Sequence, residues 1–143
     1  MIHRYATAVW KGGLKEGTGT VSTESGTLKN APYSFARRFG EGGDSNPEEL
    51  LAASHAGCFA MAFSMALGEA GHVPERLETR STVSMGKGPE GGFEIAEIAL
   101  EVKAVIPGIE EHLFQRLATE AKENCLISRV LDVKIGLTAR LEV

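Results

Sequence analysis

The longest uncharged stretch of the chain, Leu50 to Gly68, constrains the fold more than any other feature. It follows Asn46-Pro47-Glu48-Glu49, which predicts a helix start. Asn46 can cap the helix, proline suits its first position, and the two acids suit the positive end of the helix dipole. We expect the helix to run to about Ala70 and to stop at Gly71. Because it is apolar on most faces, it must be covered on most faces.

The length of this stretch approaches that of a membrane span. Alanine dominates it, however, and His55 near its middle opposes insertion, so we expect a helix of a soluble protein and no membrane partner. Four small residues also form a line at roughly helical spacing: Ala53, Gly57, Ala60 and Ser64. Such a line lets another helix approach closely, and so short a chain has little left to cover it. We therefore infer a homodimer with these helices at its centre.

Length and charge narrow the class of protein. A chain of 143 residues fits one domain, 1–143. Its net charge of −4 argues against non-specific binding of nucleic acid. The first residues, Met1 to Tyr5, lack the layout of a signal peptide, so we expect a cytoplasmic location. In that reducing compartment a working disulfide is transient and catalytic rather than structural.

The remaining pattern predicts one α+β domain. We expect strands at 4–10, 18–24 and 33–39, a loop at 40–45, a hairpin of strands 77–85 and 93–105, a helix at 107–123 and a last strand at 133–141. The apolar residues of the second hairpin strand change phase part-way along it. This change predicts a β-bulge near Ala96 or Glu97.

The chain holds two cysteines, Cys58 and Cys125, far apart in the sequence. Two thiols allow one chemistry that a single thiol does not: one attacks an oxidant, and the other resolves the product as a disulfide. The alternative is a pair of inert buried cysteines, because free cysteine is among the most buried residue types.

A thiol in an apolar helix needs a cation to ionise, because burial raises its pKa. Arg37 and Arg38 stand out as candidates, adjacent on an expected strand just before the glycine-rich loop. An arginine about 4 Å from the sulfur, at an effective dielectric constant of about 20, contributes roughly 4 kcal/mol, or about 3 pKa units. The alternative is that both arginines are solvated charges at a sheet edge.

An arginine in an apolar pocket also needs an anion, and Glu48 or Glu49 could supply it. Glu48 precedes Cys58 by ten residues, which corresponds to about 15 Å along an unbroken helix. The two share a site only if the helix is interrupted, if Arg38 bridges them, or if the glutamate comes from a partner subunit. We favour a site between subunits.

His55 lies three residues before Cys58 and could share its helix face. Together with Cys125 these residues are weak candidates for a metal site, because no Cys-x-x-Cys pair is present. We expect a histidine with satisfied hydrogen bonds in the core or at an interface. The sequence predicts neither a metal nor a cofactor.

Five segments carry a specific pattern because they occur in a fixed order and spacing. They are Thr20-Val21-Ser22-Thr23-Glu24-Ser25-Gly26-Thr27-Leu28, Asn46-Pro47-Glu48-Glu49-Leu50-Leu51, His55-Ala56-Gly57-Cys58-Phe59, Val105-Ile106-Pro107-Gly108-Ile109 and Cys125-x-x-Ser128. In these segments the chain resembles, nearly end to end, the OsmC branch of the OsmC/Ohr family. These are the osmotically inducible and organic hydroperoxide resistance proteins of bacteria.

The resemblance implies a thiol peroxidase acting on organic hydroperoxides. The implied fold is an intertwined α+β homodimer, with antiparallel sheets around central helices and sites at the subunit interface. Cys58 matches the peroxidatic cysteine of the family and Cys125 the resolving one, so the resemblance implies a Cys58–Cys125 disulfide. Arg38 matches the arginine that activates the thiolate, and Glu48 the carboxylate that orients it.

The resemblance also has limits. Arg37 has no matching role, and Leu126 stands where the family usually has proline.

The resemblance also implies the reductant, a dithiol, with lipoylated protein as the candidate. Apolar residues such as Phe59 and Met61 should favour hydrophobic peroxides. Two other functions stay open: a dimer that binds an apolar ligand or senses oxidation without turnover, and a thiol–disulfide oxidoreductase.

Overall fold

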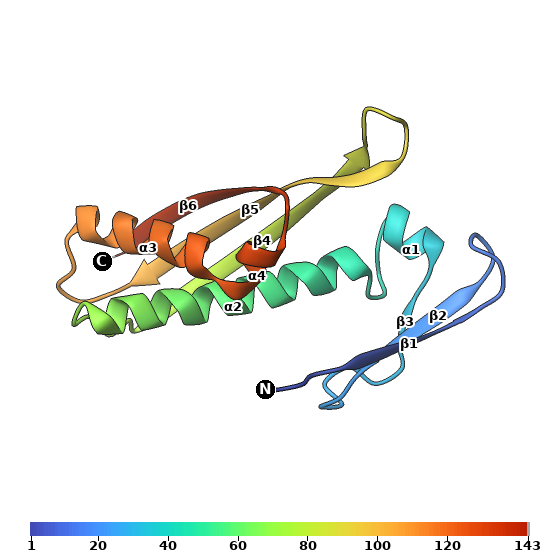
Figure 1. Ribbon diagram of the computed structural model, residues 1–143, viewed down its shortest axis with the longest axis horizontal. Coiled ribbons are helices and arrows are strands. Elements are labelled where there is room, and N and C mark those ends of the chain that lie inside the picture. Colours follow the sequence, from blue (N-terminus) through green and yellow to red (C-terminus); the bar gives the residue numbers. More distant parts are fainter. Residues whose placement is uncertain (143) are drawn as a thin grey trace. The chain divides into compact units, whose positions relative to one another are not determined.

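The computed structural model of the chain describes Met1 to Glu142 and forms two compact units (Figure 1). Unit 1 is Met1–Leu50 and unit 2 begins at Leu51. Both units combine strands and helices, so the expectation of an α+β fold is confirmed.

Unit 1 contains a three-stranded antiparallel sheet in the order β1-β2-β3, with bounds Ala6–Lys11, Thr18–Thr23 and Ala31–Tyr33. The first two strands lie where the sequence predicted them. Trp10 and Tyr33 pack together with ring centroids 5.4 Å apart. They do so over Gly19, where an added Cβ would lie 2.5 Å from a Trp10 ring carbon. Only glycine leaves room for this aromatic pair.

The strand expected at 33–39 is wrong. β3 ends at Tyr33, and a short helix, α1 (Phe35–Phe39), follows it. Ser34 is extended, and its side chain accepts a hydrogen bond from the backbone N–H of Arg37, which caps the helix. Phe35 and Phe39, one turn apart, then pack with tilted rings whose centroids are 4.8 Å apart. The two arginines therefore project from a helix.

The long helix α2 spans Pro47–Glu69, close to the bounds predicted from the sequence. The Asn46 side chain accepts the Glu49 backbone N–H at 2.8 Å, as expected of a cap. At the other end Gly71 has φ +86, and the N–H of His72 donates to the carbonyl of Leu67 at 2.9 Å. Glycine adopts this left-handed conformation without strain, so the helix stops there.

By length and composition α2 qualifies as a possible membrane span. One face of it is nevertheless inside the protein, because four of its side chains are fully buried: His55, Phe59, Phe63 and Leu67. A helix in a protein core meets the same length and composition test.

Unit 2 contains a second three-stranded sheet in the order β4-β5-β6. β4 (Arg76–Lys87) and β5 (Phe93–Val105) form the predicted antiparallel hairpin. Ser84 lies opposite Glu97 whereas Met85 lies opposite Ile95, so Ala96 is the extra residue of a bulge. The predicted bulge is confirmed.

The strand pairs are antiparallel as expected with one exception: β6 (Lys134–Glu142) pairs with β5 in parallel. Parallel neighbours need a crossover. Here α3 (Glu111–Asn124) and α4 (Leu126–Val130) carry the chain back along the sheet. α4 was not predicted, and α3 begins four residues later than expected because Gly108 has φ +74.

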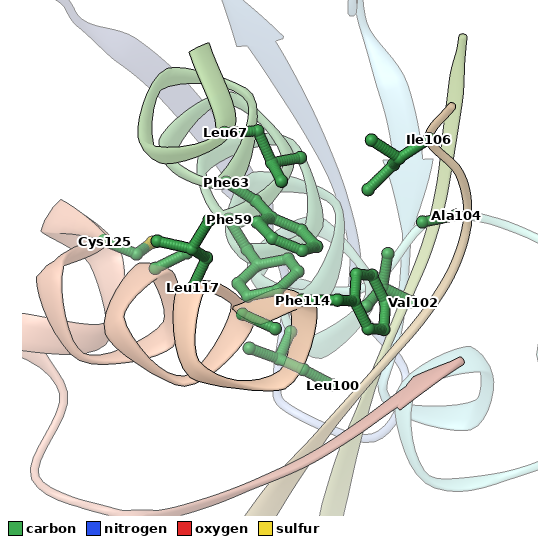
Figure 2. Close-up of a cluster of buried hydrophobic side chains, with 12 residues drawn as sticks. Phe59, Phe63, Leu67, Leu100, Val102, Ala104, Ile106, Phe114, Leu117 and Cys125 are labelled. Carbon is green, nitrogen blue, oxygen red and sulfur yellow. The ribbon is translucent and has the colours of Figure 1, made fainter. Parts of the chain in front are cut away.

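The core of unit 2 lies between the sheet and its helices. The buried side chains of β5 alternate, with Leu100, Val102 and Ala104 on one face. Phe59, Phe63 and Leu67 of α2 and Phe114 and Leu117 of α3 pack into the same cluster (Figure 2). Both helices therefore cover the same face of the sheet. Cys125 belongs to this cluster, which places one of the two sulfurs in the core.

Candidate active site

The fold of unit 2 brings the two cysteines together. Cys58 lies on α2, and Cys125 is the single residue between α3 and α4. Both are reduced; Cys58 is half-buried and Cys125 is buried. The two thiols lie close enough for each to shift the pKa of the other. Packing of α2 against the α3–α4 junction therefore brings together two sulfurs that are far apart in the sequence.

Burial raises the pKa of the Cys58 thiol, and its hydrogen bond with Cys125 raises it further. Hydrogen bonds from the backbone N–H groups of Ile127 and Leu126 act in the opposite direction but do not outweigh burial. Within unit 2, then, Cys58 is held largely as the thiol at neutral pH.

The Cys125 thiol has the opposite balance. Burial acts to raise its pKa, but hydrogen bonds from Cys58, from the backbone and hydroxyl of Ser128 and from the backbone of Ile127 together lower it. The more acidic of the two sulfurs in unit 2 is therefore Cys125. For a peroxidase in which Cys58 attacks first, some other group must lower the pKa of Cys58.

His55 is fully buried beside the thiols, and its Nε2 lies 2.7 Å from the hydroxyl oxygen of Ser128. Burial lowers the pKa of His55, so the ring is neutral near pH 7. Its Nδ1 is also buried and has no partner among the described residues. The expected satisfied histidine is thus only half satisfied. Sequence reasoning gave Ser128 no role; its only signal was its place three residues after Cys125.

Unit 1 contains the arginine and the glutamate that the resemblance singled out, and it joins them. Arg38 Nε donates to both carboxylate oxygens of Glu48, at 3.0 and 3.2 Å, and Nη2 donates to one of them at 2.7 Å. Glu48 is largely buried, with 12% of its side chain exposed. The hydrogen bonds to Glu48 raise the pKa of Arg38, so the guanidinium stays charged.

This side-on contact leaves part of the guanidinium open. Of its five N–H donors, two point at Glu48, so three do not. The Arg38 carbon Cζ also lies 5.1 Å from the centroid of the Phe39 ring. A cavity of about 250 Å³ adjoins this pair. It is lined by Trp10, Leu14, Tyr33, Ser34, Phe35, Arg38 and Phe39. The cavity thus combines an aromatic wall with one positive group.

Arg37 has a different environment. Its Nη1 donates to the carbonyl of Gly42 at 2.7 Å, and its Nε lies 3.6 Å from a carboxylate oxygen of Asp44. Arg37 therefore holds the loop after α1.

The two apolar residues expected beside the peroxide differ in exposure. Phe59 is fully buried in the core, so it cannot touch a substrate, whereas Met61 is exposed.

Residues 40–139 match the model of a family described as OsmC-like protein. The chain belongs to this family. It is 46% identical to Peroxiredoxin OsmC of Escherichia coli (strain K12), over 99% of this chain and 98% of that protein. It is 34% identical to an organic hydroperoxide resistance protein of Xanthomonas axonopodis pv. citri, over 71% and 70% of the two chains.

The fold of the OsmC-like chain is also similar to solved structures. An organic hydroperoxide resistance protein from Elizabethkingia anophelis superposes with a TM-score of 0.77 at 25% identity, over 99% of this chain and 98% of that one. Together with the named relatives, this similarity supports a peroxidase role in general terms.

Proposed function

We propose that this OsmC-like protein is a thiol-dependent peroxidase that reduces organic hydroperoxides to alcohols, with Cys58 as nucleophile and Cys125 as resolving thiol. The observation that carries the proposal is the pair of free thiols that unit 2 brings together, near enough for each to shift the pKa of the other. Two sulfurs held in this way favour a cycle of sulfenic acid and disulfide.

In the first step the Cys58 thiolate attacks the distal oxygen of the hydroperoxide. A sulfur–oxygen bond forms, the oxygen–oxygen bond breaks, and the alkoxide leaves as the alcohol after taking a proton. In the second step Cys125 attacks the sulfenic sulfur of Cys58. The disulfide forms, and the hydroxyl group leaves as water. An external dithiol then reduces the disulfide and is itself oxidised.

Arg38 has two tasks in this scheme. Its charge stabilises the Cys58 thiolate, whose pKa burial alone would keep high, and its free N–H groups stabilise the charge on the leaving oxygen. Glu48 holds the guanidinium from the side, so the free N–H groups have one orientation.

We propose that Arg38 and Glu48 act on Cys58 of a second copy of the chain. Glu48 and Cys58 stand ten residues apart on the unbroken helix α2, which is about 15 Å along its axis. The relatives' family supports a homodimer, and α2 leaves Gly57, Met61 and Met65 exposed for a partner. On this proposal residues 1–143 act as one functional domain.

The substrate class follows from the aromatic cavity beside Arg38. Its wall suits the hydrocarbon part of an organic hydroperoxide, while the guanidinium suits the peroxide oxygens. Hydrogen peroxide offers no apolar part to such a wall, so it gains less from binding. We place the reaction in the cytoplasm, with a dithiol carried on lipoylated protein as reductant and with no membrane or nucleic-acid partner.

Steady-state consumption of cumene hydroperoxide, compared with hydrogen peroxide and with a dithiol as electron donor, tests the proposal. Repeated turnover with a preference for cumene hydroperoxide is expected. Loss of only one equivalent of peroxide per subunit would instead identify a sensor or an apolar-ligand-binding dimer.

Two variants test the assignment of the thiols. Cys58→Ser should abolish peroxide consumption, and retained turnover would exclude Cys58 as the nucleophile. Cys125→Ser should still form a sulfenic acid, which a dimedone adduct reveals by intact mass. It should form no disulfide within one chain, and a normal turnover rate would exclude Cys125 as the resolving thiol.

A further inference from the structure

A chain of contacts connects His55 to the resolving sulfur. His55 and Cys58 lie on α2, one turn apart, whereas Cys125 joins α3 to α4 and Ser128 lies on α4. Ser128 connects the two: its hydroxyl oxygen lies 2.7 Å from His55 Nε2, and it stands three residues after Cys125 in the first turn of α4, where its hydroxyl lowers the pKa of the Cys125 thiol. His55 is 0% exposed and Cys125 is 1% exposed, so water does not compete for these contacts.

The unpartnered Nδ1 determines which group donates the hydrogen bond between His55 and Ser128. A neutral imidazole carries one N–H, at either Nε2 or Nδ1. At Nδ1 the proton would be a buried donor without an acceptor, and the Ser128 hydroxyl would then donate its hydrogen to Nε2 and not to sulfur. With the proton at Nε2, His55 donates to the Ser128 oxygen. The Ser128 hydrogen is then free to point at sulfur.

We propose that His55 is a positioning residue for Cys125: its Nε2–H donates to the Ser128 oxygen and thereby directs the Ser128 hydroxyl hydrogen at the Cys125 sulfur. A sulfur that accepts this hydrogen bond ionises more readily, because the bond favours the charged form. The positively charged side chains nearest to Cys125 in the sequence do not replace this hydrogen bond. Lys122 donates to the carbonyl of Ile135, and Arg129 is exposed.

The role of His55 in turnover rests on the proposed function, in which Cys125 is the resolving thiol. Disulfide formation requires Cys125 to lose its proton before its sulfur attacks Cys58. As the sulfur–sulfur bond forms and the sulfur–oxygen bond breaks, the departing hydroxide takes up one proton and leaves as water. The His55–Ser128 pair raises the fraction of Cys125 that is ready for this attack.

The first test needs no peroxide and so does not depend on the proposed function. In a Cys58→Ser background Cys125 is the one thiol, and its ionisation is followed by the ultraviolet absorbance of the thiolate against pH. The chain lacking both cysteines supplies the baseline. Ser128→Ala should raise the pKa of Cys125 by about one to two units, the worth of a hydrogen bond to a charged group. Ser128→Thr keeps the hydroxyl and should leave the pKa of Cys125 nearly unchanged.

A matched pair at His55 tests the other link. In His55→Gln an amide nitrogen stands three bonds from Cβ, as Nε2 does in histidine, so it can still donate to Ser128. In His55→Asn the nitrogen is one bond nearer the backbone and falls short. The Gln variant should keep the low pKa of Cys125, and the Asn variant should raise it as Ser128→Ala does.

Two results would overturn the proposal: an unchanged Cys125 pKa in Ser128→Ala, or equal pKa values in the Gln and Asn variants. Nitrogen NMR of the unmodified protein gives a measurement that needs no folded variant. It should show the His55 proton on Nε2, and a proton on Nδ1 would refute the argument. In the otherwise unmodified protein, Ser128→Ala should slow disulfide formation about tenfold per pKa unit near neutral pH, with sulfenic acid formation unchanged.

Discussion

Replacing Arg38 by methionine should raise the pKa of the Cys58 thiol. Methionine keeps an unbranched side chain against the Phe39 ring but removes the positive charge. The sign follows from the site: burial raises the pKa of Cys58, and the backbone N–H groups of Ile127 and Leu126 lower it by less than burial raises it. In our scheme the guanidinium supplies the rest of the lowering, so its removal leaves the pKa raised.

The magnitude can be worked from the exposure of the arginine. A guanidinium about 4 Å from the sulfur, at an effective dielectric constant of about 20, contributes roughly 4 kcal/mol, or about 3 pKa units. The Arg38 side chain is 40% exposed and shares its charge with Glu48, so solvent and the carboxylate screen it. We therefore expect a rise of about 1 to 2 units, which lowers the thiolate fraction about 10- to 100-fold near neutral pH.

The assay uses the Cys125→Ser background, in which Cys58 is the one thiol. The rate of alkylation by iodoacetamide is measured against pH, and intact mass confirms a single adduct. The midpoint of the rate profile reports the pKa of Cys58. Circular dichroism of each variant shows that the fold is kept.

Arg37→Met is the matched control, because Arg37 is the neighbour of Arg38 on α1 but holds Gly42 and Asp44. Arg37→Met should leave the midpoint of the alkylation rate profile unchanged from that of the Cys125→Ser parent. An unmoved midpoint in Arg38→Met, or an equal shift in both variants, would refute the electrostatic reasoning.

Three further predictions concern assembly, stability and pH. Mixing the Cys58→Ser chain, inactive alone, with the Arg38→Met chain, weakly active alone, should restore about a quarter of normal turnover. This is expected because half of the randomly formed dimers are mixed and each of these has one complete site; no recovery would mean that Arg38 acts within its own chain. Phe63→Ala should lower the free energy of unfolding by about 3–5 kcal/mol in urea, because the ring is fully buried and packs on Phe114 with centroids 5.6 Å apart; a loss below about 1 kcal/mol would contradict that packing. The free energy of unfolding should also fall as the pH drops below about 6.5, because burial lowers the pKa of His55 and the unfolded chain takes up a proton that the folded one refuses. His55→Gln should remove this part of the pH dependence, and identical profiles with and without His55 would rule it out.

The sequence determined the elements whose signals are local. Asn46 and Pro47 predict the start of α2 because a cap and a first-turn proline act within one turn. The bulge at Ala96 shows in the sequence because an extra residue shifts the alternation of apolar side chains. Local signals failed at 33–39, where alternating residues favoured a strand but the Ser34 cap favoured a helix.

The candidate residues came from the sequence, but their partners came from the fold. Cys58, Cys125, Arg38 and Glu48 could be named from their motifs and from the resemblance to the family. No pattern in the chain placed Ser128 between His55 and the Cys125 sulfur, or made Cys125 the more acidic thiol. The parallel pairing of β6 was equally invisible, because it depends on where the crossover helices return the chain.

There is a physical reason why the sequence predicts local elements but not the surroundings of the two sulfurs. A cap, a turn or an alternation involves residues within a few positions of one another, so the order of residues states it directly. The pKa of a buried sulfur depends on which donors and which apolar groups surround it. Those neighbours come from distant segments that only packing of α2, α3 and α4 around one core brings together.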